Sequence, residues 1–113
     1  MSANVGEVND LDFDQAVLQS DRPVLVDFWA GWCAPCRALA PRVEAVAARH
    51  SGDVRVVKVD VDQNPLAAQR YGVRAIPTLI VFNRGQEVER LLGAVSENEI
   101  ELRLNRQTGG ALH

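Results

Sequence analysis

The sequence predicts a mixed α/β fold in which one central β-sheet carries helices on both faces. Short apolar or β-branched runs alternate with segments of helical spacing, which is typical of parallel strands joined by helical crossovers. The last two strand-like segments, 78–82 and 87–92, are separated by Asn83-Arg84-Gly85, which predicts a closing antiparallel hairpin. With 113 residues the chain is long enough for one core only, so we expect a single domain over residues 1–113.

The first part of the chain supplies an edge strand, a helix and the centre of the sheet. Residues 4–8 are expected to form a short edge strand. Asp10 is a typical N-cap and predicts a helix that runs to about Ser20. Val24–Trp29 is almost continuously apolar, as expected of a central strand covered on both faces.

A long helix and a second buried strand follow. From Pro35 onward, apolar residues recur at helical spacing, and Gly52 is a typical helix end. Pro41 lies inside this pattern and removes one backbone hydrogen bond, so it should kink the helix rather than end it. The β-branched run Val54–Val61 predicts the buried strand.

The second half of the chain alternates short elements with turn signals. Asn64-Pro65 is a cap followed by proline, which predicts a short helix that Tyr71-Gly72 closes. Beyond the hairpin, Ser96-x-x-Glu99 is a capping box that begins a last helix. Residues 107–113 contain two glycines and are expected to fray.

Charge and hydropathy exclude several classes of function. The chain has 12 Lys plus Arg and 15 Asp plus Glu, a net charge of −3, so it has no basic field for nucleic acid. No apolar run is long enough to cross a bilayer, and residues 1–7 lack the positive start and apolar stretch of a signal peptide. We therefore expect a cytoplasmic protein that binds neither nucleic acid nor a membrane.

The most informative stretch is Trp32-Cys33-Ala34-Pro35-Cys36, which holds the only two cysteines of the chain. Two thiols one helical turn apart can form a disulfide with each other. In a reducing compartment such a pair is more often catalytic or metal-binding than a structural cross-link. If Cys33 lies at a helix start, unpaired backbone N–H groups and the helix dipole favour its thiolate. The pattern therefore indicates a redox-active dithiol.

A zinc site is the alternative interpretation of the cysteine pair. Zinc normally takes four ligands, and the chain offers only Cys33, Cys36, His50 and His113. His50 ends the predicted long helix far from the cysteines, and His113 is the last residue of a glycine-containing tail. We therefore expect no bound metal.

Asp27 places a carboxyl group in the middle of the apolar run Val24–Trp29. Burial disfavours the charged form, so a buried Asp27 should have a raised pKa. Our hypothesis is that it exchanges a proton with Cys36. The alternative is a partly exposed aspartate near the strand end that accepts a backbone N–H.

Five short stretches occur in an order and spacing that together are highly specific. They are Val26-Asp27-Phe28-Trp29-Ala30, Trp32-Cys33-Ala34-Pro35-Cys36, Asp62-Gln63-Asn64-Pro65, Tyr71-Gly72-Val73-Arg74 and Ile76-Pro77-Thr78-Leu79. On these residues the chain resembles the thioredoxin family along nearly its whole length. The resemblance implies the thioredoxin fold, a central mixed five-stranded β-sheet flanked by four α-helices, and a protein disulfide reductase activity.

The resemblance also implies roles for four side chains. Cys33, nearer the helix start and more exposed, would attack a substrate disulfide, and Cys36 would resolve the mixed disulfide. Asp27 would assist Cys36. Lys58 would lie near Asp27 and tune it; the alternative is a lysine whose stem packs on the sheet while its amine reaches water.

A cis peptide bond is implied before Pro77. Only about 5–6% of X–Pro bonds in folded proteins are cis, but the resemblance places a cis proline here, facing the cysteines. We expect the carbonyl of Ala75 or the N–H of Ile76 to pair with an extended substrate backbone.

Small and apolar residues around Cys33 are expected to form a substrate-binding surface of low charge. They are Trp32, Ala34, Pro35, Val73, Ala75, Ile76, Gly93 and Ala94. The alternative is that each is a scattered surface residue, with Gly93 a simple bulge. Trp29 is expected to pack beneath the site and Pro41 to be structural. Arg37 would either add positive potential to the thiolate or be a solvated helix residue.

Two positions depart from the common family pattern. Ala34 stands where glycine is usual between the cysteines, and alanine restricts the backbone and favours helix relative to glycine. Because the intervening residues tune which redox form is preferred, this change bears on the redox potential. Ala75 stands where glycine is common before Ile-Pro.

The expected partners follow from the resemblance. No Gly-x-Gly-x-x-Gly fingerprint is present, so we expect no bound flavin or nicotinamide. Reducing equivalents would come from NADPH through a thioredoxin reductase, and substrates would be disulfide-containing proteins. We expect a monomer that serves electron transport and cell redox homeostasis. Two other functions stay open: an oxidant or isomerase, which the missing signal peptide disfavours, and a binding or chaperone-like module that does not use the thiols.

Overall fold

The strand Val24–Trp29 (β2) forms the centre of the sheet, because apolar residues on both of its faces are covered. The computed structural model describes residues 4–108. Within this range, the exposed fraction of Leu25 and of Phe28, which point to opposite faces, is 0%. The other strands are β1 (Val5–Glu7), β3 (Arg55–Asp60), β4 (Thr78–Asn83) and β5 (Gln86–Leu92).

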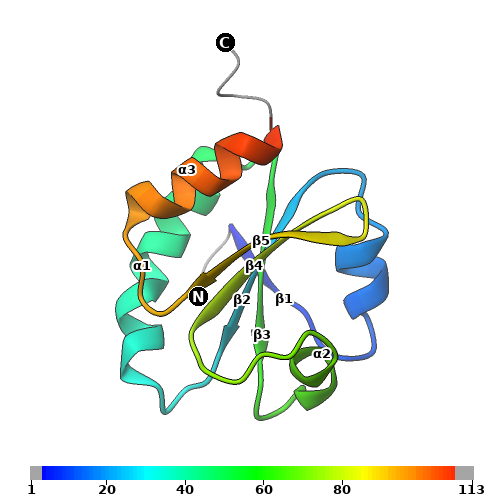
Figure 1. Cartoon of the computed structure of the whole chain (residues 1–113), viewed down its shortest axis with the longest axis vertical. Helices are drawn as coiled ribbons and strands as arrows, with labels where there is room; N and C mark the ends of the chain where they lie inside the picture. The colour runs from blue at the N-terminus through cyan, green and yellow to red at the C-terminus, as the bar shows by residue number, and fades with distance from the viewer. Residues whose placement is uncertain (1–3, 109–113) are drawn as a thin grey trace.

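The sheet is mixed, with the strand order β1-β3-β2-β4-β5 (Figure 1). The strands β1, β3 and β2 are parallel, whereas β4 is antiparallel to both β2 and β5. Parallel neighbours need a crossover connection, and α1 (Ala34–Arg49) provides the one between β2 and β3. The predicted five-stranded mixed sheet and its closing hairpin are confirmed.

Helices cover both faces of the sheet, as predicted. On one face lie α1 and α3 (Glu97–Thr108), which run side by side in Figure 1. The other face carries a short π-helical segment, η1 (Asp14–Leu18), and α2 (Pro65–Arg70). There, Phe13 meets Phe82 edge to face, with ring centroids 5.9 Å apart.

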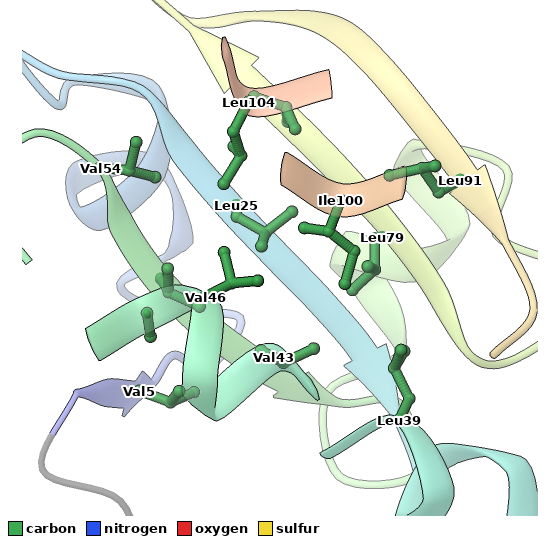
Figure 2. Packing of buried hydrophobic residues seen from close by; sticks show 13 residues of the cluster. Val5, Leu25, Leu39, Val43, Val46, Val54, Leu79, Leu91, Ile100 and Leu104 are labelled. Atoms are coloured by element: carbon green, nitrogen blue, oxygen red, sulfur yellow. The ribbon is translucent and has the colours of Figure 1, made fainter. Parts of the chain in front are cut away.

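The core between α1, α3 and the sheet holds α1 against the sheet. Figure 2 shows Val46 of α1 and Ile100 of α3 around Leu25 and Leu79 of the two central strands. Apart from Val46, Leu39 contributes from the N-terminal half of α1 and is also fully buried. These contacts fix the position of α1 against the central strands.

Asp10 caps a different helix from the one predicted. The first helical segment begins only at Asp14, and the Asp10 carboxylate instead accepts the N–H groups of Leu66 and Ala67, at 3.0 and 2.9 Å. Asn64, the predicted cap of α2, makes no capping bond; its Oδ1 accepts the Asp10 N–H at 3.0 Å. The cap of α2 therefore comes from a distant segment, which local sequence patterns do not encode.

The other helix signals agree with the structure, except for the predicted end of α1. The N–H of Glu99 donates to Ser96 Oγ at 3.1 Å, so one of the two bonds of the predicted capping box is present. The Glu99 carboxylate accepts the Nε–H of Arg103 at 3.0 Å. Pro41 lies inside α1 without ending it, as predicted. The helix α1 ends at Arg49, before the predicted end at Gly52.

The last helix is longer than predicted. It continues to Thr108, so the expected frayed tail does not begin at residue 107. The Gln107 side-chain amide donates to Glu89 Oε2 at 3.0 Å, and this contact ties the final turn to β5. The rest of the predicted tail, 109–113, lies outside the described residues.

Replacing Asp10 by alanine should destabilise the fold through α2. Two backbone N–H groups of the first turn of α2 would lose their acceptor, and the loss of a helix cap costs about 1–2 kcal/mol. Urea denaturation should show this decrease in the free energy of unfolding. Asp21→Ala, a matched change at an exposed aspartate, should change it by less than about 0.5 kcal/mol. Equal effects of the two substitutions would contradict the capping role of Asp10.

Candidate active site

Cys33 is the N-cap of α1. Its backbone is extended, with φ −90° and ψ 107°, and its Sγ accepts the N–H of Cys36 at 3.2 Å. Pro35 in the first turn has no N–H to leave unpaired, so proline suits this position. A sulfur that accepts a helix N-terminal N–H is stabilised as an anion by that donor and by the helix dipole.

Cys33 and Cys36 form a disulfide with each other, as the spacing predicts, with their Cα atoms 5.2 Å apart. The predicted difference in accessibility is wrong for this oxidised form, because the exposed fraction is 3% for each cysteine. Bonded sulfur atoms cover part of one another's surface, and the Cys33 Sγ is further covered by the Ile76 carbonyl oxygen, 3.8 Å away. The cysteines are therefore distinguished by their place in the helix.

The wall opposite the cysteines is the segment before β4. The Ile76–Pro77 peptide bond is cis, as the resemblance implies. The Ala75 carbonyl accepts the Thr78 hydroxyl at 2.6 Å, so this predicted substrate acceptor is already engaged. The Ile76 N–H has no hydrogen-bond partner among residues 4–108, so it remains available as a backbone donor.

A second backbone segment, residues 93–95, continues this wall. The Gly93 N–H donates to the Pro77 carbonyl at 2.9 Å. Gly93 has φ +83°, a conformation that L side chains rarely adopt, and this explains the glycine. The register shift between β4 and β5 lies between Val81 and Phe82, so Gly93 is not a bulge in that ladder.

Two tryptophans occupy different levels of the site. Trp32 has an exposed fraction of 69%, and its Nε1 donates to Asp62 Oδ2 at 2.8 Å. Our sequence reasoning placed Asp62 in a motif but gave it no role; its partner lies thirty positions away in the chain. Trp29 is half-buried at the end of β2, next to Lys58, which agrees with the predicted packing beneath the site.

Asp27 is buried on the face of the sheet that α1 covers. It lies two positions after Leu25 and therefore points to the same face. Its exposed fraction is 6%, and its Oδ1 has no hydrogen-bond partner in the described part of the chain. Burial raises the pKa of Asp27 from 3.8 to about 7. The raised pKa was predicted, and the alternative of a hydrogen-bonded, partly exposed aspartate is wrong.

Lys58 lies beside Asp27, opposite it in the parallel register of β2 and β3. Burial raises the pKa of Asp27, and the positive charge of Lys58 lowers it by a smaller amount. The Lys58 Nζ sits 4.8 Å from the centroid of the Trp29 ring, a cation–π arrangement. The side chain also lines a polar cleft of about 350 Å³ that includes Glu7 and Asp60. Features of both sequence interpretations of Lys58 are therefore present.

The remaining predicted surface residues lie around this site at different depths. Four of them are exposed: Ala34, Pro35, Ala75 and Ala94. Three are half-buried: Val73, Ile76 and Gly93. Arg37 is exposed, and its Nη1 donates to the Gly31 carbonyl at 2.8 Å, so it braces the loop that precedes the cysteines.

Neither a metal centre nor a membrane span is found in the described range. The residues from 4 to 108 contain no group of three or more potential metal-ligating side chains. His50 lies at the far end of α1, where its Nε2 is 2.6 Å from Glu101 Oε1. None of the helices in this range is long and apolar enough to cross a bilayer.

Replacing Asp27 by asparagine should make the fold less sensitive to pH. The folded-state pKa of Asp27, about 7, exceeds the ordinary 3.8, so ionisation opposes folding and wild-type stability falls as pH rises between these values. The unfolding free energy of Asp27→Asn relative to wild type should increase by about 2–3 kcal/mol between pH 5 and pH 8. Urea titrations at both pH values measure this difference. Asp21→Asn should show no such trend, and a pH-independent difference for Asp27→Asn would exclude a raised pKa.

Comparison with known proteins agrees with this geometry. Residues 4–106 match the sequence model of the family described as Thioredoxin. A thioredoxin from Porphyra purpurea is 46% identical over 103 residues, which cover 91% of this chain and 96% of the relative. Thioredoxin 1 from Nostoc sp. is 49% identical over 106 residues, covering 94% and 98%. Thioredoxin 1 from Synechococcus elongatus is 50% identical over 99 residues, covering 88% and 92%.

The alignments span almost the whole length of both partners in each pair. They include the disulfide at the N-terminus of α1 and the strand that carries Asp27. The chain therefore belongs to the thioredoxin family of thiol–disulfide oxidoreductases.

Proposed function

We propose that the chain reduces disulfide bonds of other proteins, with Cys33 as the attacking thiol and Cys36 as the resolving thiol. The observation that carries this proposal is the position of Cys33 as N-cap of α1, bonded to a cysteine in the first turn of the same helix. Two electrons added to this disulfide give a dithiol, and the return to the disulfide supplies two electrons to a substrate.

The first step uses the helix N-terminus. In the reduced chain, the Cys33 thiolate attacks one sulfur of a substrate disulfide, forms a mixed disulfide and releases the other substrate sulfur as a thiolate. The Cys36 N–H, which already donates to the Cys33 Sγ, stabilises this anion before attack. The half-buried Ile76 and the exposed Ala94 lie on the wall where the substrate backbone would bind.

The second step uses the buried carboxyl group. Asp27 takes the proton from the Cys36 thiol, and the Cys36 thiolate attacks the Cys33 sulfur. This forms the intramolecular disulfide and releases the second substrate sulfur, which is protonated from solvent. A base whose pKa is about 7 combines a useful ionised fraction at neutral pH with sufficient basicity. Lys58, beside Asp27, sets how far the pKa rises.

The cycle is closed by a partner. No nucleotide-binding fingerprint occurs in the sequence, so we assign the supply of electrons to NADPH through a thioredoxin reductase. Disulfide-containing proteins are the second class of partner. Within this proposal the chain acts as a monomer in the cytoplasm, a compartment in which protein thiols are kept reduced.

Cys33→Ser should abolish the reduction of insulin disulfides, because it removes the nucleophile. Cys36→Ser should retain the first step and accumulate a mixed disulfide on Cys33, which mass spectrometry detects. Insulin reduction by Cys33→Ser would eliminate the dithiol mechanism.

The midpoint potential of the wild-type couple should lie at or below the cytosolic glutathione poise of about −220 to −260 mV. A potential far above this range would identify an oxidant instead.

Asp27→Asn should slow the second step and spare the first. Loss of a general base costs about tenfold or more at pH 6, where few thiols ionise unaided, and less as pH rises. Single-turnover quench experiments with a substrate disulfide should therefore show accumulation of the Cys33 mixed disulfide at pH 6 and little at pH 9. If the mixed disulfide decays as fast as in wild type at pH 6, Asp27 is not the base.

A further inference from the structure

The side chain of Arg42 connects the helix of the cysteines to the opposite wall of the site. Arg42 lies on α1, about two turns beyond Cys36. Its Nη1 donates to the carbonyl oxygens of Ala94 and Val95, at 2.9 and 3.1 Å. The sequence gives no sign of this contact, because the partners are more than fifty positions apart.

Contacts other than those of Arg42 fix segment 93–95 at its two ends and leave its middle residue, Ala94, unsupported. At one end the Gly93 N–H donates to the Pro77 carbonyl, and at the other Val95 packs against the core beneath α1 and α3. Ala94 between them is exposed. Its carbonyl bonds only to Arg42 among the described residues, and its N–H has no partner there.

The consequence is that the backbone of segment 93–95 offers a substrate a hydrogen-bond donor but no acceptor. Arg42 occupies the acceptors of Ala94 and Val95, so segment 93–95 presents only the Ala94 N–H to a substrate. The neighbouring segment adds the Ile76 N–H, together with the Ile76 carbonyl, whose one contact among the described residues is the Cys33 sulfur. Charge-assisted hydrogen bonds are stronger than neutral ones, and a segment held in one conformation loses less entropy on binding. A polypeptide lying along this wall would use these donors, whereas a small disulfide would contact little beyond the sulfur atoms.

We propose that Arg42 is a positioning residue that holds segment 93–95 for polypeptide substrates and so favours protein disulfides over small ones. This inference rests on the proposed disulfide reductase function. Arg42 touches neither reacting sulfur, so its effect falls on substrate binding rather than on sulfur chemistry.

Arg42→Gln tests the proposal by separating binding from chemistry. We expect the KM for insulin disulfides to rise about fivefold while kcat stays within about twofold. The rate constant for the small disulfide 5,5′-dithiobis(2-nitrobenzoate) and the midpoint potential of the cysteine couple should not change. Arg42→Lys keeps the charge but carries its donors on a single nitrogen at the end of a different side chain, so its KM should lie between those of wild type and Arg42→Gln.

Arg55→Gln is the matched control. Arg55 is exposed on β3, and its side chain makes no hydrogen bond to the described residues, so its loss should leave both substrates unaffected. The proposal is overturned if Arg42→Gln leaves the insulin KM unchanged, or if it impairs both substrates equally. If Arg42→Gln does not fold, Arg42→Lys decides by the same two criteria. A wild-type chain that reduces neither disulfide would overturn the proposed function itself.

Discussion

The tight turn between β2 and α1 is the constraint on which the site depends. Ala30 is fully buried, and its carbonyl accepts the Cys33 N–H at 3.2 Å. The chain therefore passes from a buried strand into a helix within a few residues, and the first turn of that helix follows directly on the carboxyl end of β2. Cys33 stands at this corner, and its Sγ therefore accepts an N–H group from the first turn of the helix.

The same constraint sets the electrostatics beneath the sulfurs. Because α1 packs on the face that Asp27 shares, the carboxyl group is removed from water and its pKa rises. Lys58 limits this rise from the neighbouring strand. The fold thus tolerates an unfavourable buried acid at one place in its central strand, in keeping with the general association of perturbed acids with functional sites.

The sequence was sufficient for features encoded by local periodicity or by one strong motif. The alternation of apolar strands and amphipathic helices predicted the sheet, and the spacing of Cys33 and Cys36 predicted their bond. An acid inside an apolar strand predicted burial and a raised pKa for Asp27. In each case the informative residues lie within a few positions of one another.

What the sequence did not reveal depends on contacts between distant segments. The cap of α2 comes from Asp10, and the anchor of Trp32 comes from Asp62. The Arg42 clamp on the backbone of Ala94 is of the same kind. A hydrogen bond between a side chain and a distant segment produces no periodic pattern in the sequence, so such partners are identified only in the folded structure.

The buried acid also alters the charge of the whole molecule. The sequence implies an isoelectric point of about 5.3, a value that counts Asp27 as an ordinary ionised aspartate. With its pKa raised to about 7, this group is protonated at that pH in the folded chain. The native protein therefore carries close to one negative charge fewer than its denatured form there, and it should migrate to a more alkaline position in an electrophoretic pH gradient.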